Sequence, residues 1–114
     1  MAKRNKETTP PQNDGDSRPS WDAATGDLCW CGRVVLHLAP QAHAERAVLK
    51  RFEAMSWRFV VKNPLPREKL GDETGTRRSA IYNLMRHQGQ RPPIQFFSAL
   101  DGYVAWCPSE WLTD

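Results

Sequence analysis

The segment from residue 77 to residue 88 combines side chains that can contact a polyanion, and it contains no carboxylate. Its polar members are Arg77, Arg78, Ser79, Tyr82, Asn83, Arg86 and His87. Guanidinium groups bind phosphates and guanine edges, and an asparagine amide can pair with an adenine edge. The segment therefore predicts a surface that contacts nucleic acid. A solvated helix face is the plainer interpretation of the same residues, because arginine is common on protein surfaces.

No catalytic centre is expected from the remaining reactive side chains. His37, His43 and His87 belong to three separate predicted elements. No Ser-His-Asp order and no glycine-rich phosphate loop accompanies them. We therefore expect a protein that is not an enzyme and has no catalytic residues.

The cysteines are Cys29, Cys31 and Cys107, and their odd number argues against a secreted disulfide framework. Cys29 and Cys31 alternate within a predicted strand, so their sulfur atoms should point to the same face. Cys107 as a third thiol and three scattered histidines would supply the ligands of a structural zinc site, which is the less favoured alternative. We interpret the cysteines as small buried hydrophobes and expect no metal and no cofactor.

Helical periodicity predicts the elements that position the basic segment. Apolar residues at helical spacing predict a helix from Arg77 to about Gln88, which Thr76 would cap and Gly89 would end. A longer amphipathic helix is predicted over residues 41–57, with Glu45 among the charged residues of its polar face. A short helix between them is predicted from Pro66 to Gly71.

Two hairpins are predicted on either side of these helices. The first joins residues 28–31 to residues 34–38 through a turn at Gly32. The second joins residues 94–97 to residues 103–106, and its turn is predicted at Asp101-Gly102. An N-terminal hairpin, three helices and a C-terminal hairpin together predict an α+β fold, the winged helix-turn-helix with the last hairpin as its wing.

Residues 1–20 carry basic side chains, prolines and few apolar residues, so we expect a disordered basic tail ahead of one domain over residues 21–114. The net charge of +3 and the isoelectric point near 9.0 favour a polyanionic partner. The chain has no apolar run of roughly 18 residues and no secretory signal. We therefore expect no membrane partner and a cytoplasmic location.

Residues 21–107 resemble the DNA-binding effector domain of OmpR/PhoB-type response regulators, here without a receiver domain. The similar segments, in family order, are Gly32-Arg33-Val34-Val35-Leu36-His37-Leu38-Ala39-Pro40, residues 44–52, Pro66-Arg67-Glu68-Lys69-Leu70, residues 75–89 and residues 94–103. Ser98 occupies the wing position at which the family usually has an arginine.

The resemblance implies a sequence-specific regulator of transcription that binds double-stranded DNA with residues 76–88 in the major groove. Arg77, Arg78 and Arg86 would contact phosphates or guanine edges, Asn83 an adenine edge, Tyr82 and His87 the DNA backbone, and Ser98 would lie on the wing. The alternative is a protein–protein interaction module without DNA binding, with Phe97, Leu100 and Trp111 as its contact patch. Another protein partner and a homodimer are left open.

Overall fold

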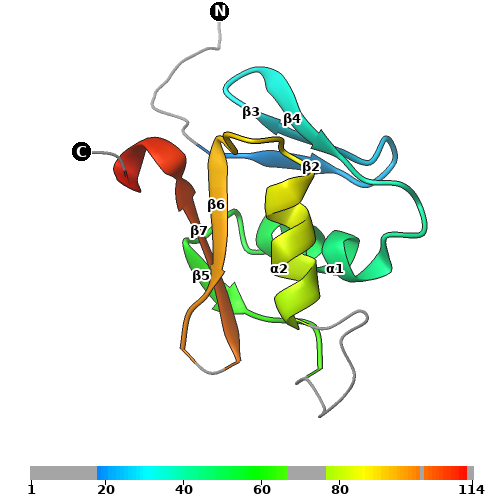
Figure 1. Cartoon of the computed structure of the whole chain (residues 1–114). Helices are drawn as coiled ribbons and strands as arrows, with labels where there is room; N and C mark the ends of the chain where they lie inside the picture. The colour runs from blue at the N-terminus through cyan, green and yellow to red at the C-terminus, as the bar shows by residue number, and fades with distance from the viewer. Residues whose placement is uncertain (1–17, 67–76, 101, 113–114) are drawn as a thin grey trace, which may run out of the picture.

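The computed structural model describes residues 18–66, 77–100 and 102–112. In that part of the chain, two α-helices and two three-stranded antiparallel sheets form an α+β fold, which Figure 1 shows from blue to red along the sequence. The predicted tail up to residue 17 lies outside the described residues, as does the predicted short helix beyond Pro66.

The N-terminal sheet consists of β2 (Ser20–Asp22), β3 (Asp27–Trp30) and β4 (Arg33–His37), in that order. Trp21 pairs with Leu28, and Leu28 pairs with Leu36, so these three side chains share one face of the sheet. All three are buried. The alternation of apolar and polar residues therefore turns one face of this sheet toward the core.

The two helices pack against each other and against the sheets. The apolar face of α1 (His43–Ala54) buries Val48, Leu49 and Phe52 completely. The second helix, α2 (Arg77–Arg86), lies against both α1 and the C-terminal hairpin and buries Ala80 and Leu84. Helical spacing of the apolar residues explains both buried stripes.

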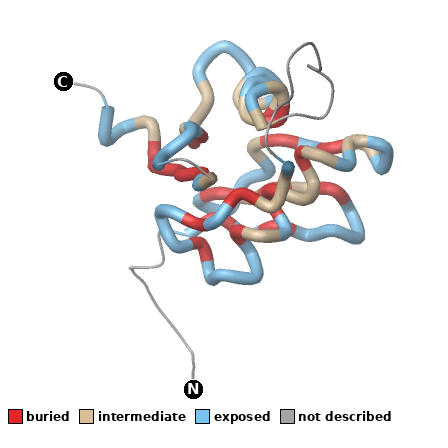
Figure 2. The backbone as a smooth tube through the Cα atoms, turned by 90° about the horizontal axis from the view of Figure 1, so that it is seen from below, coloured by how far each residue is buried: buried red, intermediate tan, exposed pale blue. Residues whose placement is uncertain are grey.

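The second sheet has the order β5-β7-β6 and is formed by β5 (Val60–Lys62), β6 (Ile94–Ser98) and β7 (Tyr103–Pro108). A 3₁₀ turn, η1 (Ser109–Leu112), follows β7. In Figure 1 this sheet stands beside α2, with the N-terminal sheet above the helices. The view in Figure 2 shows buried stretches crossing the middle of the molecule, while exposed stretches form its outer loops.

Trp106 of β7 lies at the centre of an aromatic core. Its ring centroid is 5.7 Å from that of Trp30, 5.8 Å from that of Trp57 and 5.1 Å from that of Phe59. Its indole N–H donates a hydrogen bond of 3.0 Å to the carbonyl oxygen of Trp57. Trp106 thereby joins the N-terminal sheet, the end of α1 and the second sheet in one cluster.

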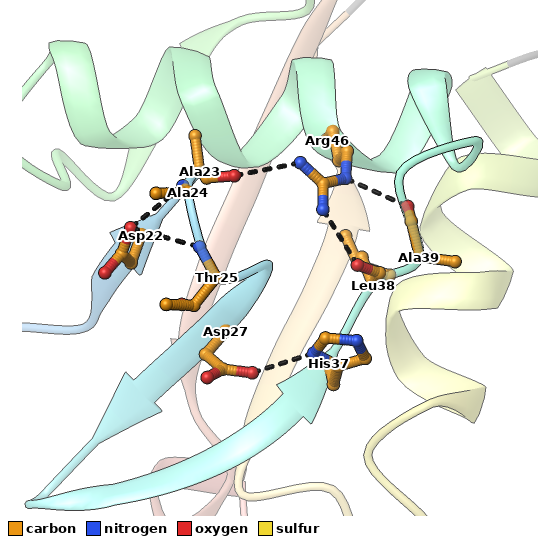
Figure 3. A network of polar contacts seen from close by, with 9 residues as sticks. All are labelled: Asp22, Ala23, Ala24, Thr25, Asp27, His37, Leu38, Ala39 and Arg46. Carbon is orange, nitrogen blue, oxygen red and sulfur yellow. Dashed lines mark hydrogen bonds and ion pairs between the residues drawn. The ribbon is translucent and has the colours of Figure 1, made fainter.

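Arg46 connects α1 to the N-terminal sheet through backbone carbonyls (Figure 3). Its guanidinium donates to the carbonyl oxygens of Ala23, Leu38 and Ala39 at 2.9–3.1 Å. The same group lies 5.5 Å from the centroid of the Trp21 ring. Five N–H donors in a planar fork allow one arginine to satisfy several carbonyls that the loops leave without strand partners.

The expected winged helix-turn-helix with an N-terminal hairpin, three helices and a C-terminal hairpin wing is corrected by this structure. Two three-stranded sheets replace the two hairpins, and the described residues contain two α-helices. The N-terminal hairpin gains β2, because Trp21 is buried against Leu28. The C-terminal hairpin gains β5, because Val61 pairs with Val104 and both are buried.

Other expectations about individual elements are confirmed. The C-terminal hairpin, now the β6–β7 part of the second sheet, forms with β6 ending at Ser98 and β7 beginning at Tyr103. The helices predicted over residues 41–57 and 77–88 are present as α1 and α2, each shorter than predicted. One expectation about α1 is wrong: Glu45, predicted on the polar face, is buried, with 8 % of its surface exposed.

A change at Cys31 is expected to stabilise the fold. Cys31 and Gly32 form the two-residue loop between β3 and β4, with φ angles of 54° and 78°. Two positive φ angles define a type I′ turn, for which Asn-Gly is the preferred pair. We expect Cys31→Asn to raise the free energy of unfolding by roughly 0.5–1 kcal/mol, measured by urea denaturation. A decrease would show that the thiol makes a contact that the turn requires.

Candidate nucleic-acid interface

The exposed side of α2 carries three of the residues expected to contact nucleic acid. Arg78, Tyr82 and Arg86 are spaced four residues apart, so they lie in one row along the helix. All three are exposed, while Ala80 and Leu84 on the opposite side are fully buried. The four-residue spacing and the burial of the other face therefore produce a row of two guanidinium groups with a phenol between them.

Tyr82 and Arg86 also contact each other. The guanidinium carbon of Arg86 lies 5.9 Å from the centroid of the Tyr82 ring. A cation over an aromatic face is attracted by the quadrupole of the ring, which favours this arrangement even at an exposed site. The pair limits the orientations of both side chains before any ligand arrives.

Arg77 and Asn83 are engaged inside the protein. Asn83 is half-buried, and its side-chain amide donates a hydrogen bond of 2.9 Å to the carboxylate of Glu45 on α1. Arg77 is also half-buried and donates from Nε to the carbonyl oxygen of Leu65 at 2.9 Å. These two contacts fix α2 against its neighbours, and the hydrogen bond from Asn83 gives the buried Glu45 carboxylate a partner.

Gln88 links the end of α2 to the second sheet, a role that its sequence position does not indicate. Its side-chain amide donates to the carbonyl oxygens of Leu84 and Ile94 at 3.1 Å and 2.9 Å. Its side-chain oxygen accepts a hydrogen bond of 2.9 Å from the backbone N–H of Ile94. The exposed row on α2 is thus held in a fixed position relative to β6.

The remaining expected contact residues lie beyond the row. His87 is exposed directly after α2, and Ser98 is exposed at the end of β6, on a different element from the row. Arg91, which the sequence reasoning missed, is also exposed, between α2 and β6. A basic residue between Gly89 and the Pro92-Pro93 pair is the signal that could have indicated it. The structure therefore groups Arg78, Tyr82 and Arg86 on one helix face and places His87, Arg91 and Ser98 outside that row.

The cysteines only partly match the expected burial. Cys107 is buried, and this burial raises the pKa of its thiol, which disfavours the reactive thiolate. Cys29 is half-buried in β3, whereas Cys31 is exposed in the turn, because the strand ends at Trp30. Within residues 18–66, 77–100 and 102–112, no group of three or more His, Cys, Asp or Glu side chains could hold a metal ion.

Comparisons with known proteins add no assignment to this geometry. Neither a protein-family model, nor a curated protein, nor a solved structure matches the chain. In the part of the chain that the structure describes, no helix has the length and apolar character needed to cross a membrane.

Proposed function

We propose that this protein binds double-stranded DNA through the exposed row of Arg78, Tyr82 and Arg86 on α2. The observation that carries the proposal is the arrangement of this row: two cations and a phenol face solvent, and α2 contains no acid. Guanidinium groups bind phosphate oxygens strongly through charge-assisted hydrogen bonds. A carboxylate in the row would repel the same phosphates, so its absence matters as much as the arginines.

The proposal extends to sequence-specific regulation of transcription, which the resemblance to OmpR/PhoB-type effector domains implies. In the proposed complex α2 lies in the major groove, whose width of about 12 Å admits an α-helix. Arg78 and Arg86 contact phosphates, and the nearby His87 and Arg91 add to the positive surface. Asn83 and Arg77 have the structural roles described above, and we leave them out of the proposed contact.

The experiment is a salt titration of duplex binding by the wild type and the double variant Arg78→Gln/Arg86→Gln. Each lost phosphate contact reduces the slope of log K against log salt by about 0.9, so we expect the slope to become shallower by about two units. Arg33→Gln is the control, because Arg33 is exposed at the start of β4 and carries the same charge. A wild type without affinity for any duplex at low salt would overturn the proposal. The proposal would also be overturned if Arg33→Gln reduced the salt slope by as much as each of the two arginines on α2 does.

One observation favours the interaction module as a second candidate. Phe97, Leu100 and Trp111 are 43 %, 79 % and 61 % exposed, so three large apolar side chains near the C-terminus reach the surface. Trp111 nevertheless packs on its own domain, because its ring centroid lies 5.2 Å from that of Phe59. This candidate predicts that Phe97→Ala impairs binding to a protein partner while the arginine variants leave that binding unchanged.

A further inference from the structure

Tyr82 occupies the middle of the exposed row on α2, four residues from Arg78 and four from Arg86. Its side chain is 64 % exposed, the most exposed aromatic side chain among the residues that the structure describes. The ring contacts Arg86, which is itself exposed, so this contact does not bury the ring in the domain. The Tyr82 ring lies at the centre of a basic face and is oriented by Arg86. This position suits contact with a ligand better than a role in the core.

Helix geometry places this ring at the deepest point of the proposed complex. At about 1.5 Å of rise per residue, the eight steps from Arg78 to Arg86 span about 12 Å of a straight helix. The major groove curves around the duplex, so a straight helix approaches its floor most closely at the middle of the contact face. The two arginines then lie toward the groove walls, where the phosphates are, and Tyr82 lies toward the base edges.

The floor of the major groove presents one apolar group to such a ring. Guanine, cytosine and adenine display hydrogen-bond donors and acceptors there, whereas thymine also displays its C5-methyl group. A phenyl ring cannot satisfy the donors and acceptors that it covers, and covering polar groups without hydrogen bonds is unfavourable. The thymine methyl group is apolar, so its burial against the ring is favourable.

We propose that Tyr82 is a specificity-determining residue that recognises the C5-methyl group of thymine in the major groove. This inference rests on the proposed DNA binding and names the base feature that α2 reads. The contact is made by the face or edge of the ring and does not use the phenolic hydroxyl.

The test compares duplexes that differ by this methyl group alone. One probe is an alternating A·T duplex, and the second is the same duplex with deoxyuridine in place of thymidine. Burial of a single methyl group changes affinity by about three- to fivefold, so we expect the thymidine duplex to bind that much more tightly. A third probe supplies a positive control: 5-methylcytosine in a G·C duplex places a methyl group at the same ring position and should strengthen binding over unmodified cytosine.

Two variants separate the ring from the hydroxyl. Tyr82→Phe keeps the ring and should retain the preference for thymidine over deoxyuridine, whereas Tyr82→Ala should reduce the ratio to about one. Both variants should keep the wild-type salt slope, because the arginines are intact, and thermal melts will show that both remain folded.

The outcomes distinguish this inference from the proposed function. Equal binding of both duplexes by the wild type, with a steep salt slope, overturns the role of Tyr82 and leaves DNA binding standing. Loss of the preference in Tyr82→Phe overturns the ring contact in favour of the hydroxyl. Retention of the preference in Tyr82→Ala assigns it to another residue. If the wild type binds no duplex at low salt, the proposed DNA binding itself is wrong.

Discussion

Trp106→Ala is expected to lower the free energy of unfolding by at least about 3 kcal/mol, because truncation of a large buried aromatic costs about 3–5 kcal/mol. Trp106 is 1 % exposed and contacts three aromatic rings, those of Trp30, Trp57 and Phe59. The substitution also leaves the buried carbonyl oxygen of Trp57 without its hydrogen-bond donor. Domains of this size are stable by about 5–15 kcal/mol, so much of the stability would be lost.

Urea denaturation followed by circular dichroism measures this effect. Trp111→Ala is the matched control, because it removes the same side chain at a site that is 61 % exposed. We expect its effect to be less than about 1 kcal/mol, as for most surface substitutions. Similar losses in the two variants would show that Trp106 is not the centre of the core.

Gly26→Ala is the second substitution with a large expected effect. Gly26 has a φ angle of 79°, and an added Cβ would lie 2.5 Å from the carbonyl oxygen of Leu38 and 2.7 Å from an Nη of Arg46. The glycine cannot shift easily, because its N–H donates to Asp22 and its carbonyl accepts from Leu38, both at 2.8 Å. The added methyl group would therefore displace the atoms of the hydrogen bond by which Arg46 joins α1 to Leu38.

Gly32→Ala separates the steric clash from the backbone conformation. Gly32 has a φ angle of 78°, almost the same as that of Gly26, but no atom lies within 4 Å of an added Cβ. Its substitution should cost about 1–2 kcal/mol for the left-handed conformation alone. We expect Gly26→Ala to lose at least about 2 kcal/mol more, since clashes in packed regions typically cost about 1–3 kcal/mol. Equal thermal midpoints for the two variants would show that the loop relaxes around the methyl group.

Periodicity located the long elements correctly, and it failed where elements are too short to show a period. The apolar spacing in α1 and α2 and the Asp-Gly turn signal predicted both helices and the C-terminal hairpin. In contrast, β2 and β5 have three residues each, which is too few for alternation to be visible. Their inclusion in the sheets depends on burial of Trp21 and Val61 against distant strands, which is a property of the tertiary structure.

The candidate site shows the same division between local and distant causes. Composition indicated α2, and helical spacing is sufficient to place Arg78, Tyr82 and Arg86 on one face. The contact of Asn83 with Glu45 joins residues 38 positions apart, so no local pattern could indicate it. Sequence reasoning therefore found the helix but could not separate the side chains that face solvent from those that hold the helix in place.

The hydrogen bonds of Gln88 have a consequence for the thermodynamics of recognition. A side-chain amide that pairs with both backbone groups of Ile94 imitates a neighbouring strand, and it couples the end of α2 to β6. The helix face and the hairpin are thus assembled before any partner arrives. Association of a preorganised surface loses little conformational entropy, so more of the contact energy is retained as affinity. If the row on α2 binds DNA as proposed, the deformation needed for the fit falls on the duplex, so an easily deformed duplex would bind more tightly.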